Sequence, residues 1–500
     1  MENTDWKRYL LFLTIIFAVF VAYDYFTSSN LTQNKSRNQT EVAHKQPQPN
    51  PTVDVNLYLG SEREKLTPKH FITVEGKDLK LQIAQEGAKI VSAYDKKFKK
   101  ELIEGYEKAY NIYPLEILTP SWETTKLINF SRYQCEKENL KVVCQLNKDQ
   151  ISVKKVFTFD QSGYLSKVSI EIKGVKDAYL YIGMTPNEDP FYTHIGPIFK
   201  FSNGEVLRIN PDDLKGATSF HGDIIWSGEE GRYFIKAVKY NTHTAVVFPV
   251  SYLHNGETQY VTATAVKIKP TAQVTFLSSP KEYEILKNVN FVEAIDFGVL
   301  SFLAYPTFLV LYFFYKIFHS WVAAIFILTL ILKLIFFPLM ISSTRSMKKM
   351  QELAPKLEEL RKKYANDPQR LQQEIVKLYK ETGFNPFGGC LPILVQIPIF
   401  FALYKVLIVT PDLALEGFLW IPSLAEKDPF YILPILMGLT MVAQSFIAPS
   451  PNKGQNTVMY LMAAVFTFLF ATFPSGLVLY WTLNNILSIL QTWVVYRYLS

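Results

Sequence analysis

One stretch of the sequence constrains the fold more than any other. Residues 321–343, WVAAIFILTLILKLIFFPLMISS, are almost entirely apolar, and about 20 such residues let a helix cross the hydrocarbon core of a bilayer. Lys333 lies inside this run, and a lysine near the middle of a membrane helix costs roughly 2.5 to 3.5 kcal/mol on insertion scales. The fold must therefore contain something that offsets the cost of this charge.

The position of Lys333 restricts how that cost is offset. It lies nine residues before Ser342, about 14 Å along the helix axis, which is too far for easy snorkelling to the lipid headgroups. Thr329, four positions earlier, lies on the same helix face and makes that face polar. We therefore expect an inward face that water reaches. The alternatives are a locally thinned bilayer and a carboxylate partner elsewhere in the chain.

Composition indicates a polytopic α-helical membrane protein with at least one soluble domain. Hydrophobic residues make up 49% of the chain, and several apolar runs reach spanning length. The net charge of +7 does not require a nucleic acid partner, because much of the positive charge lies beside apolar runs, where it sets orientation. Three cysteines are too few for a disulfide scaffold. Cys135 and Cys144 either pair across a hairpin in an oxidising compartment or stay free.

The N-terminal part of the chain predicts an anchor followed by a linker. In residues 1–26, Lys7 and Arg8 precede an apolar run without a small-residue cleavage site before Asp24. We expect an uncleaved signal-anchor transmembrane helix with its N-terminus in the cytoplasm, the alternative being a cleaved signal peptide. Residues 27–56 contain too few apolar residues to form a core, so we expect a disordered polar linker.

Residues 57–290 change to short alternating segments separated by turn signals. Leu79, Leu81 and Ile83 fall on one face of a strand. Many strands and no long helix predict a large antiparallel all-β sandwich. Further strands are predicted over 154–172 as a hairpin, and over 232–240, 242–250, 259–268 and 272–278.

This β domain shows no recognisable catalytic or metal motif. It lacks HExxH, Gly-x-Ser-x-Gly and paired-cysteine metal spacings, and we interpret His194 and His221 as structural residues. We therefore expect no enzymatic activity, cofactor or metal. A secondary transporter is a weaker alternative, because the matched repeats with broken helices that such proteins show are missing from the sequence.

The apolar segment within residues 291–319 is long enough to span the membrane, although Pro306 interrupts it and Lys316 and His319 close it. If it crossed, the β domain would lie on the side opposite to the one that the positive flank of the first helix favours. We therefore expect an amphipathic helix that lies along the outer interface of the membrane.

A charged region, residues 344–384, follows the predicted membrane helix over 320–343. Apolar residues recur at intervals of three and four, and Asn366-Asp367-Pro368 supplies a cap and a first-turn proline. We expect a helical hairpin of coiled-coil type in the cytoplasm. Its basic residues act either as orientation determinants or as a docking surface for partners or acidic lipid. They include Arg361, Lys362, Lys363, Lys377 and Lys380.

Residues 385–500 predict the remaining four transmembrane helices, at about 389–409, 430–448, 456–473 and 476–497. The connection over 411–428 carries four carboxylates and one lysine, which suits the outer side of the membrane. Lys453 and Arg497 then fall inside. The charges agree with six spans and with both termini in the cytoplasm.

Several motifs in order resemble the YidC/Oxa/Alb membrane protein insertases. They are PFGGCLPILVQIPIFFALYKVL at 386–407, FPSGLVLYWTLNNILSILQ at 473–491, the hairpin sequence SMKKMQELAPKLEELRKKY at 346–364 and the charge of the preceding helix. The resemblance to the five-helix insertase core covers about 320–497. The signal anchor, the β domain, which is similar to a β-supersandwich, and the interfacial helix resemble the Gram-negative bacterial YidC form.

The resemblance implies a membrane insertase and chaperone of the bacterial inner membrane. Such proteins pass hydrophobic segments of nascent membrane proteins from the cytoplasm into the lipid through a hydrophilic groove, alone or with the Sec translocon, without nucleotide hydrolysis. Membrane lipids and, weakly through the cytoplasmic loops, the ribosome are the other implied partners. No specificity for nucleic acid is implied.

The resemblance also implies a set of groove residues. Lys333 aligns with an arginine of the family, and this is a departure because lysine lacks the rigid bidentate fork. A positive charge there attracts acidic residues in the outward-bound tail of a substrate. By residue type alone, the aromatic and amide side chains would be packing or helix-bridging groups. The other groove positions are Thr329, Gln396, Ile397, Pro398, Phe400, Tyr480, Trp481 and Asn484.

Overall fold

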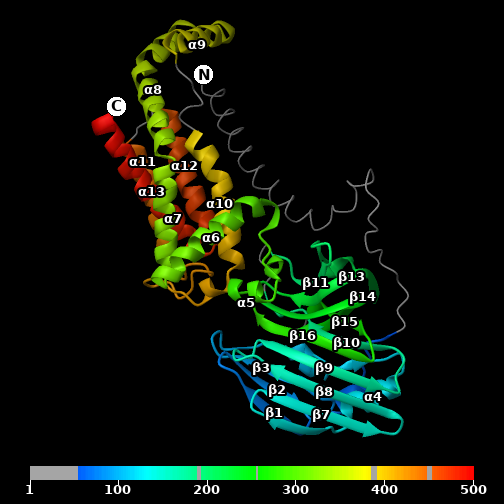
Figure 1. Cartoon of the computed structure of the whole chain (residues 1–500). Helices are drawn as coiled ribbons and strands as arrows, with labels where there is room; N and C mark the ends of the chain where they lie inside the picture. The colour runs from blue at the N-terminus through cyan, green and yellow to red at the C-terminus, as the bar shows by residue number, and fades with distance from the viewer. Residues whose placement is uncertain (1–54, 189–192, 255–256, 384–390, 448–452, 500) are drawn as a thin grey trace. The chain divides into compact units, whose positions relative to one another are not determined.

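The computed structural model describes residues 55–188, 193–254, 257–383, 391–447 and 453–499 (Figure 1). The chain divides into two compact units, a β unit over Phe26–Asp296 and a helical unit that includes Phe297–Ser500. The predicted signal anchor over 1–26 lies outside the described residues, as does almost all of the predicted linker over 27–56.

Two antiparallel sheets make up the β unit. The smaller sheet has the order β1 (Phe71–Glu75), β2 (Leu79–Ala84), β3 (Lys89–Asp95), β4 (Lys100–Glu101). The larger sheet, counted over the described residues, has twelve strands: β5 (Ile117–Leu118), β6 (Gln134–Glu138), β7 (Lys141–Lys148), β8 (Ile151–Phe159), β9 (Leu165–Lys173), β10 (Ala178–Met184), β11 (Gly196–Phe201), β12 (Val206–Arg208), β13 (Thr218–Glu230), β14 (Phe234–His254), β15 (Glu257–Ile268) and β16 (Thr271–Pro280). Its main path runs β12-β11-β13-β14-β16-β9-β8-β7-β6.

One apolar core joins the two sheets. Leu81 and Ile83 of β2 are buried in the same cluster as Val153 and Phe157 of β8. The predicted alternation in β2 is confirmed, because Leu79, Leu81 and Ile83 are buried while Lys80 is exposed. Burying one face of each sheet against the other is how an antiparallel sandwich stabilises itself. The β unit also contains four short helices: α2 (Ser61–Glu64), α3 (Gly105–Ala109), α4 (Trp122–Phe130) and α5 (Tyr283–Asn288).

One prediction in this unit is wrong. The expected strands over 232–240 and 242–250 form a single strand, β14. The polar residues between them resemble a turn, but they lie where β14 changes neighbours. Residues 234–239 pair with β16, whereas residues 245–254 pair with β15. Only the tertiary pairing reveals this exchange, because each half alternates like an ordinary short strand.

The two cysteines of the first hairpin of the larger sheet are paired. Cys135 of β6 lies directly opposite Cys144 of β7, and the two form a disulfide. The pairing decides between the two alternatives left open by the sequence. It also indicates an oxidising compartment for the β unit.

A fully buried carboxyl, that of Glu229 in β13, lies inside the larger sheet. It accepts hydrogen bonds from the hydroxyls of Thr185, Thr262 and Thr264 at 3.0, 2.8 and 2.6 Å. Burial raises the pKa of Glu229 to about 7, although these hydrogen bonds and the charge of Lys236 favour the ionised form.

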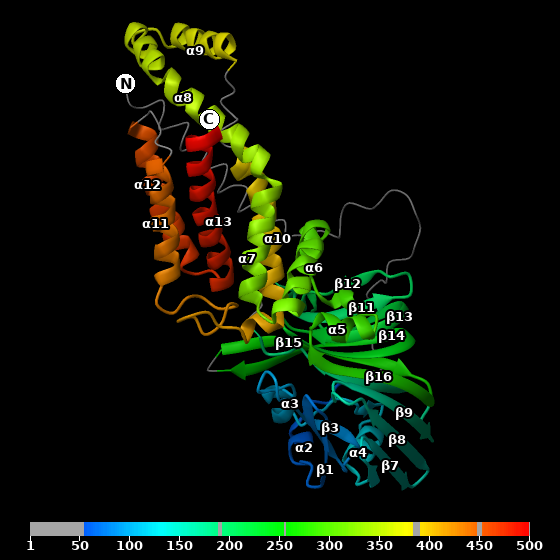
Figure 2. The ribbon, with the colours of Figure 1, turned by 60° about the vertical axis from the view of Figure 1, so that its left-hand side comes forward.

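The helical unit contains eight α-helices within the described residues. They are α6 (Ser301–Phe318), α7 (Trp321–Ile335), α8 (Phe337–Lys363), α9 (Pro368–Thr382), α10 (Leu391–Val409), α11 (Ile432–Ile447), α12 (Lys453–Phe470) and α13 (Ser475–Val494). Figure 2 shows α7 and α10 to α13 side by side. Helix α13 packs against α7, α10 and α11, and α6 packs against α7 and α10.

The helix predicted over 320–343 is broken. Helix α7 ends at Ile335, and α8 continues at an angle of 62° after Phe336. Pro338 explains the break, because it has no N–H to donate to the carbonyl of Leu334 and its ring clashes with that carbonyl. Together the two helices are long and apolar enough to form one bent membrane span.

Among the described helices, α6 is the only single one that is long and apolar enough to span a membrane. It begins at Ser301 rather than near residue 291, and His319, in the left-handed conformation, ends it as expected. Its placement along the membrane interface stays a prediction. Three shorter apolar segments accompany it: Val395–Val409, Ile432–Ile447 and Met459–Phe470.

The helical hairpin after the break is confirmed. Asp367 caps α9 by accepting a hydrogen bond from the N–H of Arg370 at 3.0 Å, and Pro368 is the first helical residue. Leu353 and Leu357 of α8 are buried against α9.

The Glu229 carboxyl predicts a pH dependence for the β unit. Because its folded pKa is about 7 and its ordinary value is 4.5, the stabilisation is fully present below pH 4.5 and is lost as the pH rises through 7. The loss amounts to about 3 kcal/mol. Hydrogen exchange of β13 and β15 amides in the whole protein, corrected for intrinsic rates, measures it. Glu229→Gln should remove this part of the dependence; an unchanged pH profile in that variant would contradict the prediction.

Candidate functional site

Lys333 lies in the last turn of α7 and is held by α13. Its ammonium, on a partly buried side chain, donates a hydrogen bond to Ser488 Oγ at 2.5 Å. Its backbone carbonyl accepts a hydrogen bond from Gln491 Nε2 at 3.0 Å. Two side chains one turn apart on α13 therefore bind the two ends of one residue.

The charge of Lys333 has no nearby counter-ion among the described residues. Its ammonium donates to the neutral hydroxyl of Ser488, and it forms no ion pair with a carboxylate of the described residues. This argues against the carboxylate partner that the sequence left open. A cation that only neutral groups hold keeps its full attraction for an incoming anion.

Thr329 faces the interior of the helical unit, one turn before Lys333. It is 1% exposed, and its hydroxyl donates to the carbonyl of Ile325 at 2.6 Å within α7. The face that carries Thr329 and Lys333 therefore points towards other helices, whereas the access of water to it stays a prediction. The hydroxyl is already paired, so Thr329 adds polarity to this face without a free donor.

A line of polar side chains runs along α13. Tyr480, Asn484 and Ser488 follow one another at four-residue intervals and are 1%, 9% and 8% exposed. The Tyr480 hydroxyl accepts a hydrogen bond from the Gln396 amide of α10. Gln396 and Lys333 therefore both hydrogen-bond to residues of α13, the helix that carries Tyr480 and Asn484. Their role as groove residues stays a prediction. Sequence reasoning missed Ser488 and Gln491, although their helical spacing with Tyr480 was available as a signal.

An aromatic cluster adjoins this line. The rings of Phe400 and Trp481 meet edge to face with centroids 5.0 Å apart. Phe470 of α12 lies 5.8 Å from Phe400 and 5.4 Å from Trp481, and Phe466 stacks on Trp481 at 6.3 Å. The sequence did not single out the two α12 residues; their four-residue spacing was the only signal.

The remaining two predicted groove residues, Ile397 and Pro398, have apolar side chains and are not part of the polar line. Ile397 is partly buried and Pro398 is exposed on α10. Their predicted contact with a substrate helix stays a prediction.

The connection between α10 and α11 holds the opposite ends of the site helices. Glu416 accepts hydrogen bonds from Ser320 Oγ and from the N–H groups of Trp321 and Val322 at 2.7, 2.8 and 3.2 Å. A carboxylate at a helix N-terminus satisfies free donors and interacts favourably with the helix dipole. Sequence analysis interpreted this acidic connection only as an orientation signal.

The same connection caps α13. The carbonyls of Leu424 and Glu426 accept hydrogen bonds from the N–H groups of Gly476 and Ser475 at 2.9 and 2.7 Å. Both helices that form the Lys333 site are therefore tied to one loop at their N-terminal ends.

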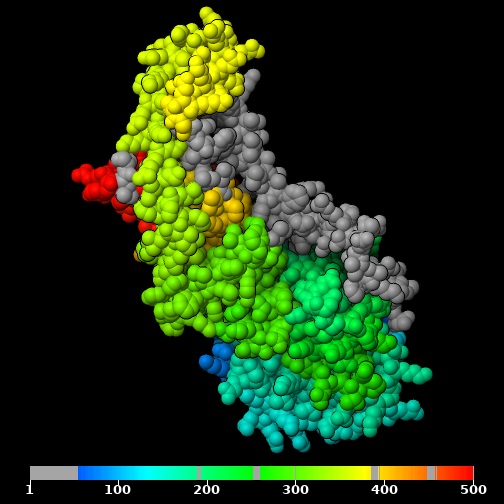
Figure 3. Space-filling model, turned by 45° about the horizontal axis from the view of Figure 1, so that its top comes forward, coloured from blue at the N-terminus to red at the C-terminus, as the bar shows by residue number. Residues whose placement is uncertain are grey.

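The predicted docking residues are all exposed on the hairpin: Arg361, Lys362, Lys363, Lys377 and Lys380. The first three end α8, where positive charge suits the C-terminal end of the helix dipole. Lys362 pairs with Glu358 at 3.0 Å. In the space-filling view, α9 (yellow) lies at the end of α8 (Figure 3).

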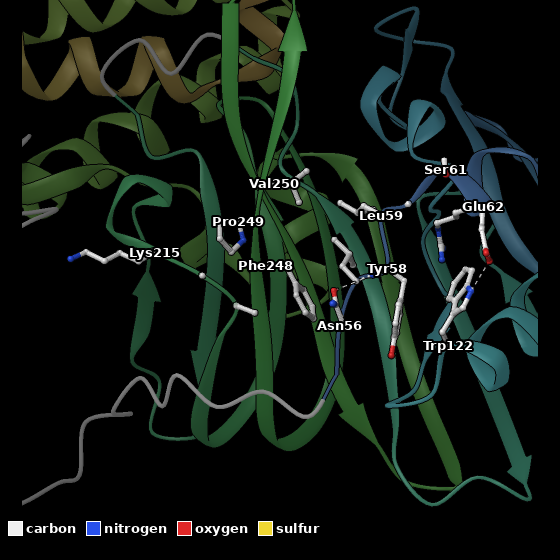
Figure 4. A pocket seen from close by; sticks show the side chains of 15 residues that line it. Asn56, Tyr58, Leu59, Ser61, Glu62, Trp122, Lys215, Phe248, Pro249 and Val250 are labelled. Carbon is white, nitrogen blue, oxygen red and sulfur yellow. Dashed lines mark hydrogen bonds between the residues drawn. The ribbon is translucent and has the colours of Figure 1, made fainter.

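A cavity of about 770 Å³ lies in the β unit. Figure 4 shows Lys215 at one end and Trp122 with Glu62 at the other. Its polar groups are largely engaged, since Glu62 accepts from Trp122 Nε1 at 3.1 Å and Tyr58 donates to the carbonyl of Pro120 at 2.7 Å. The described residues contain no group of three metal-ligating side chains.

Comparison with known proteins gives consistent matches along the chain. The family model described as 60Kd inner membrane protein matches residues 313–500, and that described as YidC periplasmic domain matches residues 71–310. The chain is 40% identical over 508 residues to the membrane protein insertase YidC of Aquifex aeolicus, covering 99% of this chain and 96% of that protein. With the membrane protein insertase YidC of Syntrophus aciditrophicus the identity is 39% over 370 residues, covering 69% and 67%.

A solved structure is also similar. The crystal structure of an active YidC insertase with the first transmembrane domain resolved covers 87% of this chain and 94% of its own, at 19% identity and a TM-score of 0.42.

The Glu416 cap predicts a stability effect. Glu416→Gln removes the charge from the N-terminus of α7 and weakens its hydrogen bonds, which should cost about 1 to 2 kcal/mol. The melting temperature of the detergent-solubilised protein should fall by roughly 2 to 4 °C. Glu426→Gln is the matched control, because the Glu426 side chain is exposed in the same loop. Equal shifts in the two variants would disprove the capping role.

Proposed function

Because the chain belongs to the YidC family of membrane protein insertases, we propose that its helical unit performs the insertion step and that Lys333 receives the substrate. The protein is an insertase of the inner membrane with a periplasmic β domain. One observation carries the proposal for Lys333: the ammonium of this partly buried side chain donates to the neutral Ser488 hydroxyl and forms no ion pair with any carboxylate in the described part of the chain.

Electrostatic attraction starts the proposed step. Two unit charges 4 Å apart attract by about 4 kcal/mol at an effective dielectric constant of 20. An acidic residue in the outward-bound tail of a substrate would gain part of this energy at Lys333. A hydrophilic groove around the lysine would shorten the apolar barrier that the tail must cross.

Burial of the substrate in lipid completes the step. Each Å² of apolar surface removed from water contributes about 25 cal/mol, so a hydrophobic segment supplies its own driving force. We propose that it passes along Phe400, Trp481, Ile397 and Pro398, and that no nucleotide or other reaction is required. The aromatic contacts between α10, α12 and α13 support this path, because they offer an apolar surface beside the polar line of α13.

The proposed topology follows from the charges. Both termini and the α8–α9 hairpin lie in the cytoplasm, and α6 lies along the periplasmic interface. The disulfide between Cys135 and Cys144 supports a periplasmic β unit.

We propose nascent membrane proteins, the Sec translocon, membrane lipids and, weakly, the ribosome as partners. The exposed cations of the hairpin support an electrostatic contact with anionic surfaces such as ribosomal RNA or acidic lipid.

The proposed electrostatic step predicts an effect of the charge of Lys333. In proteoliposomes, Lys333→Met should reduce protease-protected insertion of a client with an acidic tail about tenfold, which corresponds to 1.4 kcal/mol of lost attraction. Lys333→Arg should retain insertion because it keeps the charge. Lys427→Met, on an exposed loop lysine, serves as the control. Normal insertion by Lys333→Met would refute the electrostatic step.

The proposed docking role of the hairpin predicts an effect on ribosome binding. Replacing Lys377 and Lys380 by Glu should weaken cosedimentation with ribosomes, and the remaining binding should depend less on salt. The control replaces Lys77 and Lys80, exposed on the β unit, by Glu. If both double variants bind ribosomes like the unaltered protein, the hairpin is not the docking surface.

A further inference from the structure

Two side chains of α13 form hydrogen bonds with Lys333 of α7, one at each end of the residue. Ser488 Oγ binds its ammonium, and Gln491 Nε2 binds its backbone carbonyl. The two partners are 155 and 158 residues away in the sequence. A single packing contact would not engage both the charged end and the backbone of one residue.

The Gln491 contact has a local cause. The last carbonyls of a helix lack intrahelical partners, and α7 ends at Ile335 just before Pro338. The N–H of Phe336 reaches the carbonyl of Leu332 at 3.0 Å, and Gln491 reaches the next carbonyl, that of Lys333. Gln491 therefore caps α7 at the residue that carries the charge.

The Ser488 contact fixes the ammonium without neutralising it. A lysine side chain has many rotamers, and holding it in one of them lowers the cost of ordering it when a substrate arrives. A carboxylate in place of Ser488 would also hold it, but would compete with the acidic substrate. A hydroxyl is uncharged, so it accepts a hydrogen bond from the ammonium without neutralising its positive charge.

Helix α13 is itself well anchored. Its N-terminal amides bond the loop carbonyls of Leu424 and Glu426, and Asn485 donates to Thr440 Oγ1 of α11 at 3.1 Å. It can therefore act as a fixed frame for the end of α7 next to the 62° bend.

We propose that Ser488 and Gln491 are positioning residues that hold the Lys333 ammonium, with its charge uncompensated, in the place where it meets the acidic tail of a substrate. The inference rests on the proposed function of Lys333. It assigns to these two side chains a role in selecting substrates by tail charge, exerted only through the lysine.

The test uses the whole protein in proteoliposomes and two clients that differ only in whether the tail carries two acidic residues or their amides. Ser488→Ala should slow insertion of the acidic-tail client by roughly three- to tenfold and leave the amide-tail client unchanged. Ser488→Thr keeps the hydroxyl and should restore insertion. Gln491→Met should show the same selective loss as Ser488→Ala.

Background and control variants separate positioning from folding. In Lys333→Met, adding Ser488→Ala should cause no further loss, because the residue it acts through is gone. Thr492→Val is the matched control: it removes a buried hydroxyl one turn along α13 that has no hydrogen-bond partner among the described residues. Rates are normalised to the folded protein recovered by size exclusion.

The outcomes distinguish this inference from its premise. If Lys333→Met does not discriminate between the two clients, the proposed function of Lys333 fails, and the positioning role fails with it. If Lys333→Met discriminates but Ser488→Ala and Gln491→Met do not, only the positioning role is overturned. Equal loss with both clients, or a loss that persists in the Lys333→Met background, also overturns it.

Discussion

The hydrogen bond between the Lys333 ammonium and the Ser488 hydroxyl is the interaction on which the packing of the site helices depends. The cost of burying Lys333 is offset by a neutral hydroxyl from α13 rather than by a carboxylate. This solution leaves the positive charge free to act on another molecule. It also requires α7 and α13 to pack closely where Ser488 meets Lys333.

The acidic connection between α10 and α11 satisfies a second need of the same helices. Glu416 caps α7 and the carbonyls of Leu424 and Glu426 cap α13, so both helices of the site begin on one loop. Polar groups at helix ends within a membrane need partners from the protein itself. The loop supplies them at one end, and Gln491 supplies one at the other end of α7.

The β unit deals with buried polarity in a related way. Glu229 is surrounded by three threonine hydroxyls, so its carboxyl keeps hydrogen bonds in either protonation state. The consequence is a stability that depends on pH, a property that sequence alternation alone does not reveal. Strand pairing brings Thr185, Thr262 and Thr264 to one point from two strand regions distant in sequence.

Local chemistry determined what the sequence by itself could predict. Apolar length and the charges beside it indicated the membrane helices, Asp367-Pro368 indicated the start of α9, and alternation indicated strands such as β2. These signals act over a few residues, so they survive without knowledge of the fold. The break at Phe336 also has a local cause, Pro338, but the apolar pattern around it hid that signal. The tertiary structure alone decided the union of two predicted strands in β14 and the meeting of Lys333 with Ser488 and Gln491. Such contacts join residues more than 150 positions apart, and only the packing of whole helices and sheets brings them within bonding distance.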